Sequence, residues 1–283
     1  MNDQLVNIDI DLNLFNNIYP DLNGNQSSEY YDCPKFNKLS MNSNTNLLLL
    51  NFNIRSIIAN FDTFICFTNL LNKKFGILNF SESWLNDNNK NLYIIEGYDA
   101  FHNARCDGRR GGGLSVYISN VFKSKVIHPC TISLPTIETL FIETVKENCR
   151  LLIISIYRPP SANATLFIDK LSELLSIISG NGYDEIILCG DFNLDIMNYD
   201  NNENTLNLLN SHTSQSLILR ITKPSRITNQ TATLIDNIFI NQPNGFVSGI
   251  LIKKSLLWPR ASKWRNYYHR IWVQLSTTCS NFT

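Results

Sequence analysis

The stretch that decides the fold is Ile186-Ile187-Leu188-Cys189-Gly190-Asp191-Phe192-Asn193. Its run of apolar residues predicts a strand that is buried on both faces, as in the sheets of α/β proteins. A glycine ends the run, and a carboxylate (Asp191) and an amide (Asn193) follow. Ligands of open α/β sheets bind at the carboxyl ends of the strands. The stretch therefore predicts either a functional carboxylate and amide at a strand end or a plain Asx-type turn.

Several other apolar runs end on polar residues. These runs, each with its polar residue, are Leu47–Ile54 with Asn53, Gly76–Phe80 with Glu82, Leu151–Ile156 with Tyr157, and the strand Thr233–Ile240 with Asp236. Helical spacing from Phe167 to Ile178 predicts a helix with Ser161 as N-cap and Gly180 as its end. Two more helices are expected, one from an N-cap at Asn60 and one over 204–211. Alternating strands and helices predict an α/β layered fold, and polar residues at so many strand ends favour one shared site.

Composition sets bounds on domain number and compartment. The chain has 283 residues, no net charge and 43% hydrophobic residues, which suits one large α/β domain or two small ones. Zero net charge gives no bulk electrostatic argument for a nucleic-acid partner. The seven cysteines are single, so neither a zinc site nor a disulfide framework is indicated. Without a signal-peptide pattern or a long apolar run, we expect an intracellular chain, cytoplasmic or nuclear, that does not associate with membranes.

The two ends of the chain differ from its middle. Residues 1–45 are rich in Asn, Asp and Ser and show no helical or strand period, so a flexible leader is expected. After Asp236 no acidic residue occurs, and three of the four tryptophans lie beyond Ile252. We therefore expect residues 46–252 to form the domain and residues 253–283 to form an atypical basic aromatic tail.

The polar strand ends offer hard oxygen ligands, which suit Mg²⁺ and also Mn²⁺. Glu82 helped by Asn53 would suffice for Mg²⁺, because this ion takes few carboxylates and keeps its waters. Asp191 is placed to orient or deprotonate water, and Asn193 and Tyr157 to donate hydrogen bonds to a phosphate. No small-molecule cofactor is expected. Each residue also has a purely structural alternative, as a turn, a cap or a packing residue.

The basic glycine-rich segment Arg105–Gly113 is a further candidate. A phosphate cradle requires a helix after the glycines, and a strand is predicted over Leu114–Ile118 instead. We therefore expect the glycines to serve backbone geometry, with contact between the arginines and a polyanion as the alternative.

A series of short motifs resembles the endonuclease domain of non-LTR (LINE-type) retrotransposons, which belongs to the endonuclease/exonuclease/phosphatase superfamily. The resemblance covers roughly residues 29–252. The motifs, in chain order, are Asn53-Ile54-Arg55-Ser56, Ser81-Glu82-Ser83-Trp84-Leu85, Gly111-Gly112-Gly113, Ile156-Tyr157-Arg158-Pro159-Pro160, Gly190-Asp191-Phe192-Asn193, Pro224-Ser225-Arg226-Ile227-Thr228 and Leu234-Ile235-Asp236.

The resemblance implies a DNase I-like fold, a four-layer α/β sandwich with two facing mixed β-sheets flanked by helices. It implies a Mg²⁺-dependent phosphodiester hydrolase that nicks DNA, next to a reverse transcriptase that this sequence does not contain. The roles carried over by matching motif are metal binding for Asn53 and Glu82, phosphate contact for Tyr157 and Asn193, handling of the nucleophilic water for Asp191, orientation of a catalytic histidine for Asp236, and nucleic-acid contact for Arg55, Arg158 and Arg226.

The sequence departs from the family at its end. Family members carry Ser-Asp-His on a last strand, and this chain contains no Ser-Asp-His. His269 lies in the basic aromatic tail without an adjacent Asp. We therefore expect a domain that lacks its last strand through a truncation, frameshift or unspliced junction. The alternatives are a catalytically dead fragment with weak nucleic-acid binding and, from the same superfamily, a small-molecule phosphodiesterase or phosphatase.

Overall fold

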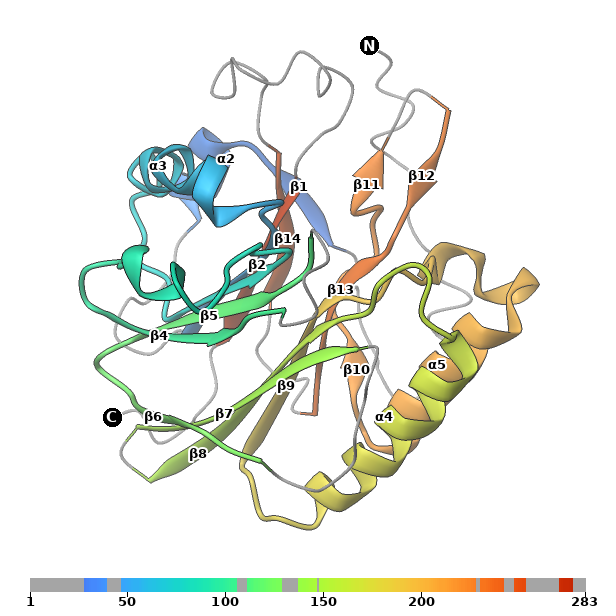
Figure 1. Cartoon of the computed structure of the whole chain (residues 1–283). Helices are drawn as coiled ribbons and strands as arrows, with labels where there is room; N and C mark the ends of the chain where they lie inside the picture. The colour runs from blue at the N-terminus through green and yellow to red at the C-terminus, as the bar shows by residue number, and fades with distance from the viewer. Residues whose placement is uncertain are drawn as a thin grey trace.

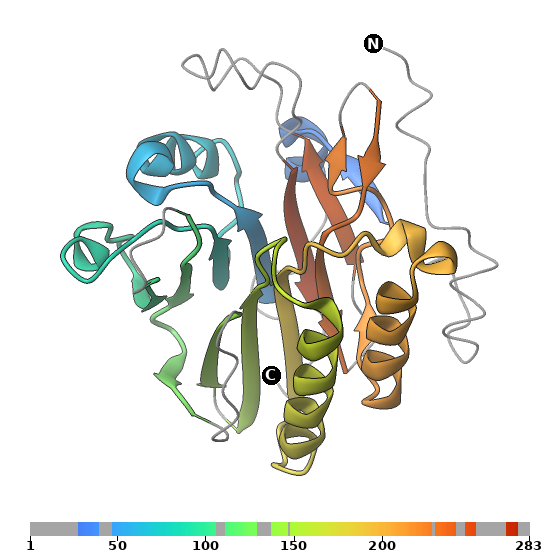
Figure 2. The ribbon, with the colours of Figure 1, turned by 45° about the vertical axis from the view of Figure 1, so that its right-hand side comes forward.

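Two β-sheets face each other, and helices cover the outer face of each (Figures 1 and 2). The computed structural model describes residues 28–39, 47–105, 111–128, 137–146, 148–227, 230–241, 247–252 and 270–276. This arrangement is the predicted four-layer α/β sandwich, and the fold prediction is confirmed.

The first sheet has seven strands, with β2 and β3 parallel and their outer neighbours antiparallel. Its strands, in spatial order, are β1 (Glu29–Tyr31), β14 (Val247–Ile252), β15 (Arg270–Ser276), β2 (Leu47–Asn53), β3 (Ile77–Ser81), β5 (Leu114–Ser119) and β4 (Tyr98–Asn103).

The second sheet has six strands, of which β8 and β9 are parallel. Its strands, in spatial order, are β10 (Ile218–Leu219), β13 (Asp236–Ile240), β9 (Glu185–Asp191), β8 (Cys149–Tyr157), β7 (Glu138–Lys146) and β6 (Lys123–Val126). A separate two-stranded ribbon pairs β11 (Arg226–Ile227) with β12 (Ala232–Thr233). The strand predicted over Thr233–Ile240 is thus divided, and Asp236 begins β13.

The helices lie on opposite sides of the paired sheets (Figure 2). The first sheet packs against α2 (Cys33–Lys38) and α3 (Ile57–Thr68), and the second against α4 (Ala164–Ser179) and α5 (Glu203–Ser214). Two short 3-10 helices, Lys90–Leu92 and Ile196–Asn201, complete the secondary structure described.

Two of the predicted N-caps are wrong. The α3 helix is capped by Ser56, whose side chain accepts from the backbone of Ala59, whereas Asn60 lies inside the helix and donates to Ile54 O. The α4 helix is capped by Asn163 and not by Ser161. In both cases the residue that caps the helix lies a few positions from the predicted one and also carries a side-chain oxygen. Which of the two residues acts as the cap depends on where the chain enters the helix.

Strand β2 shows why polar residues lie between the sheets. Leu48, Leu50 and Phe52 pack in the core beneath α2 and α3, while Leu49 packs in the core between the sheets. Because side chains alternate along a strand, Asn51 and Asn53 share the inner face with Leu49. The strand therefore delivers Asn53 to the space that faces the second sheet.

Both ends of the domain differ from the expected boundaries. Glu29–Tyr31 pairs with β14, and Phe36 of α2 is 1% exposed, so part of the predicted leader belongs to the fold. Arg270–Ser276 of the predicted tail forms β15 between β14 and β2. Seven residues of the predicted tail thus lie within the first sheet. Residues 1–27, 40–46, 253–269 and 277–283 lie outside the described residues.

Two expectations from composition can be compared with the structure. Cys66 and Cys189 are not in disulfides, whereas Cys149 is disulfide-bonded, although no disulfide framework was indicated by the sequence. Within the described ranges, no helix is long and apolar enough to cross a membrane.

We predict that Gly190→Ala destabilises the domain by about 1–3 kcal/mol, because the added methyl overpacks a closed site. Gly190 has φ +149°, and a Cβ built there would lie 1.8 Å from the carbonyl oxygen of Ile156. Urea unfolding measures the change. The matched control is Gly180→Ala at the end of α4, where φ is −79° and the nearest atom to a Cβ is 3.7 Å away. Equal stability of the two variants would contradict the prediction.

Candidate active site

The side-chain amide of Asn53 joins two carboxylates from different sheets. Its Nδ2 donates to Glu82 Oε1 at 3.1 Å and to Asp191 Oδ2 at 3.0 Å. Asn53 ends β2, Glu82 follows β3, and Asp191 ends β9. The parallel pairs β2–β3 and β8–β9 explain this meeting, because they bring strand ends of both sheets to one edge.

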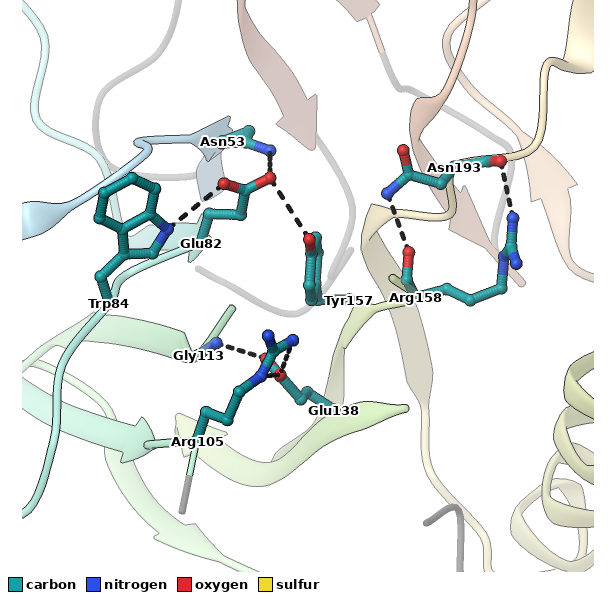
Figure 3. A network of polar contacts seen from close by, with 9 residues as sticks. All are labelled: Asn53, Glu82, Trp84, Arg105, Gly113, Glu138, Tyr157, Arg158 and Asn193. Carbon is teal, nitrogen blue, oxygen red and sulfur yellow. Dashed lines mark hydrogen bonds and ion pairs between the residues drawn. The ribbon is translucent and has the colours of Figure 1, made fainter. Parts of the chain in front are cut away.

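Two aromatic side chains hold the carboxylate of Glu82 from opposite sides (Figure 3). Tyr157 donates its hydroxyl to Glu82 Oε1 at 3.4 Å, and Trp84 donates its indole N–H to Oε2 at 3.3 Å. Tyr157 is buried, and this burial, followed by the charges of Glu82 and Asp191, raises the pKa of its phenol. The phenol therefore stays protonated and acts as a hydrogen-bond donor.

Asp191 and Asp236 form a buried pair of acids. They are direct neighbours in the register of β9 and β13, and their exposed fractions are 2% and 9%. Burial raises the pKa of Asp191 well above its usual range, and the charge of Asp236 raises it further. Burial also raises the pKa of Asp236, against a hydrogen bond with Ser225 that lowers it. Two adjacent acids in such a place bind a proton more readily than a solvent-exposed carboxylate does.

Asn193 is held in place by Arg158 (Figure 3). Its backbone N–H donates to Asp191 Oδ1 at 3.0 Å, and its Nδ2 donates to Arg158 O at 2.8 Å. Arg158, for which nucleic-acid contact was predicted, is only 3% exposed, and that contact stays a prediction. Its guanidinium donates to the carbonyls of Phe192, Ala162 and Asn193 at 2.6–2.7 Å, so Arg158 anchors the loop that carries Asn193.

The other two arginines predicted to contact nucleic acid are exposed. Arg55 follows Asn53 by two residues and has φ 45°. Arg226 lies in β11, and its positive charge lowers the pKa of Asp236. Both therefore lie next to site residues, and their contact with nucleic acid stays a prediction.

Unfavourable backbone conformations gather at this edge. In the described part of the chain, positive φ at non-glycine residues occurs at Ser216 and at five positions around the site. These five are Arg55, Ser56, Glu82, Trp84 and Asn193. Each such residue costs of the order of 1–3 kcal/mol and persists only where the surroundings enforce it, which is common at functional sites.

The sequence analysis missed a polar bridge directly beneath the site. Asn79 Nδ2 donates to Asn51 Oδ1 at 2.7 Å, and Ser155 Oγ donates to Asn79 Oδ1 at 2.6 Å. Asn51 also reaches Gly190 O, at 3.5 Å. The sequence does contain a signal for this bridge, because Asn51, Asn79 and Ser155 each stand between two apolar residues within a strand.

Asn53 and Glu82 fit a divalent metal ion. The Oδ1 atom of Asn53 is buried and has no hydrogen-bond partner, while its Nδ2 lies between two carboxylates. Amide and carboxylate oxygens are the ligands that Mg²⁺ prefers, and it keeps several waters. No group of three or more His, Cys, Asp or Glu side chains in the described residues is arranged to hold a metal, so water would have to complete the coordination.

One family model and several solved structures resemble this chain. Residues 151–255 match the family model described as endonuclease-reverse transcriptase. The endonuclease domain of TRAS1, a telomere-specific non-LTR retrotransposon, superposes with a TM-score of 0.58 at 13% identity, covering 82% of this chain and 98% of that one. The AP endonuclease LMAP from Leishmania major gives 0.65 at 11% identity, covering 96% and 97%.

A third solved structure is a variant of the 3' phosphatase NExo from Neisseria, bound to a product DNA hairpin. Its TM-score is 0.56 at 13% identity, covering 81% of this chain and 98% of that one. Among curated proteins nothing matches. The structural likenesses establish the fold, and the family match over residues 151–255 confirms the resemblance drawn from the motifs. The chain thus has the fold of these solved structures, and its residues 151–255 resemble the endonuclease-reverse transcriptase family model.

Proposed function

We propose that this chain is a Mg²⁺-dependent phosphodiester hydrolase that nicks DNA, as expected of the endonuclease of a non-LTR retrotransposon. The observation that carries the proposal is the amide of Asn53, which lies within hydrogen-bond distance of both Glu82 and Asp191. Further support comes from the solved structures with this fold, which include an endonuclease domain, an AP endonuclease and a 3' phosphatase bound to product DNA.

In this proposal Asp191 takes a proton from the attacking water as general base. Tyr157 donates its phenolic hydrogen to a phosphate oxygen, and Asn193 does the same from a loop that Arg158 anchors. Glu82 and Asn53 would hold Mg²⁺, and the same oxygen ligands would also suit Mn²⁺. The bound ion supplies stabilisation of negative charge on the phosphate oxygens.

The alternative is a catalytically dead fragment that binds nucleic acid weakly. It is favoured by the absence of Ser-Asp-His from the sequence.

A histidine nevertheless precedes β15 directly in the chain, in Tyr267-Tyr268-His269. Because β15 runs antiparallel to β2, it begins toward the end of β2 that carries Asn53. His269 itself lies outside the described residues. We propose it as the histidine that replaces the one in Ser-Asp-His, with Asp236 as its orienting acid.

The first test of the function is nicking of supercoiled plasmid in the presence of Mg²⁺. We expect Asp191→Asn to slow nicking by about 10²–10⁴-fold, because a general base is lost. Glu82→Gln should raise the Mg²⁺ concentration needed for half-maximal nicking. Asp169→Asn, an exposed acid on α4, is the control and should nick like the parent chain. If the parent chain does not nick DNA at any Mg²⁺ or Mn²⁺ concentration, the proposed activity fails and the alternative, a catalytically dead fragment, is supported.

The second test concerns the histidine. We expect His269→Ala to reduce the rate of plasmid nicking by about 10²–10⁴-fold, as for loss of a general acid–base. The matched control is His128→Ala, which follows β6 in the second sheet. Equal rates for the two variants would show that His269 has no part in the reaction.

The third test uses pH. Because the charge of Asp236 raises the pKa of Asp191, removing that charge lowers this pKa. Asp191 then becomes a base at lower pH, so the acidic limb of the nicking rate should shift to lower pH in Asp236→Asn. Each profile is normalised to its own plateau, since this change also lowers the absolute rate. An acidic limb that stays in place or moves to higher pH would contradict the assignment of Asp191 as the base.

A further inference from the structure

The glycine-rich segment is tied to an ion pair that the proposed reaction does not use. Glu138, at the start of β7, accepts from Arg105 Nε at 2.6 Å and lies 2.5 Å from Arg105 Nη2. The two side chains are 13% and 14% exposed, so the pair is largely removed from solvent. The other carboxylate oxygen of Glu138 accepts the backbone N–H of Gly113 (Figure 3).

The ion pair and the neighbouring Ser83 explain why residues 112 and 113 are glycines. A Cβ at Gly112, where φ is +74°, would lie 2.2 Å from Arg105 Nη2 and 2.4 Å from Glu138 Oε1. A Cβ at Gly113 would lie 2.5 Å from Ser83 Oγ. Only glycine leaves room for the backbone to pass so close to the pair. Gly112 therefore makes room for the ion pair and Gly113 makes room for Ser83, and a phosphate cradle is not needed to account for either glycine.

The same glycines hold the segment that carries Glu82. The carbonyl of Gly113 accepts from Ser83 N at 3.0 Å, and the carbonyl of Gly112 accepts from Trp84 N at 2.9 Å. Ser83 and Trp84 are the two residues that follow Glu82, which itself has φ 53°. A backbone in this unfavourable conformation needs external support, and the two hydrogen bonds supply it.

The ion pair also contacts Tyr157. Glu138 lies directly opposite Tyr157 in the register of β7 and β8. The guanidinium of Arg105 lies over the phenol ring of Tyr157, 5.9 Å from its centre, within the range of cation–π attraction. Figure 3 shows the pair on the side of Tyr157 away from Asn193. One ion pair thus supports both Glu82, through the glycines, and its partner Tyr157.

We propose that Arg105 and Glu138 are positioning residues that set Glu82 and Tyr157 against each other. The pair joins the first sheet, where Arg105 follows β4 and Gly113 precedes β5, to β7 of the second. Its loss would let the Glu82 segment and the Tyr157 ring move independently. The catalytic consequence rests on the proposed function, whereas the positioning itself does not.

The test reads the position of Glu82 without catalysis. Trp84 donates its indole N–H to Glu82, so its indole resonance in a ¹H–¹⁵N NMR spectrum reports on that carboxylate. Trp84→Phe identifies this resonance among those of the four tryptophans. We expect Glu138→Gln and Arg105→Met to shift it, with a smaller shift in Arg105→Lys, which retains the charge. Arg105→Lys also serves if the other two variants fail to fold.

The matched control breaks a different ion pair that also involves a glutamate of β7. Arg150 of β8 and Glu143 of β7 are joined at 2.9 Å, and Arg150→Met should leave the indole resonance of Trp84 in place. In plasmid nicking, the Arg105 and Glu138 variants should lose kcat, with little change in KM. Small misplacements of reacting groups lower a reaction rate by up to about 10²-fold. Arg105→Lys should recover part of the lost kcat.

Two outcomes would overturn the proposal. One is an indole resonance of Trp84 that stays at its parent position in folded Glu138→Gln or Arg105→Lys. The other is an equal shift in Arg150→Met, which would indicate general loosening of the sheet. If the parent chain does not nick DNA, the proposed function fails, but the NMR comparison still decides whether the pair positions Glu82.

Discussion

The buried polar bridge between the two sheets is the constraint on which the site depends. Asn51, Asn79 and Ser155 are at most 1% exposed; Asn79 donates to Asn51 within the first sheet, and Ser155 of the second sheet donates to Asn79 across the interface. A buried polar group without its partner costs about 1–3 kcal/mol, so a slip of either sheet that breaks the bridge is penalised. Asn53 and Tyr157 each lie two residues beyond a member of the bridge, on the same strand face. The bridge therefore fixes where both enter the site.

The site above this bridge combines features that oppose folding. Two buried acids lie side by side, the Oδ1 atom of Asn53 has no partner, and Glu82 has positive φ. Desolvated carboxylates and strained backbone persist only when rigid surroundings enforce them. Those surroundings are the two sheets, the loop anchored by Arg158, and the glycine segment held by Arg105 and Glu138. A cation near Glu82 would relieve the crowding of negative charge, which is the physical link between this geometry and the proposed metal.

The first sheet is completed by segments from both ends of the chain. Two strands from beyond residue 246, β14 and β15, lie between β1 and β2, so residues far apart in sequence become neighbours. This pairing places Arg270–Ser276, from the predicted tail, inside the first sheet. Composition could not reveal it, because a strand of seven residues gains its stability from partners on either side and not from its own sequence.

The sequence by itself determined the strand cores, the layered α/β class, and the polar residues that follow apolar runs, because burial imposes a period that local sequence displays. It also placed Asn53, Glu82, Tyr157 and Asp191 at strand ends. Only the tertiary structure decided which polar side chains meet. It turned Arg158 inward as a loop anchor, joined Arg105 to Glu138, and connected Asn51, Asn79 and Ser155. Such contacts join residues from different strands, and their partners depend on sheet order and register, which no local pattern encodes.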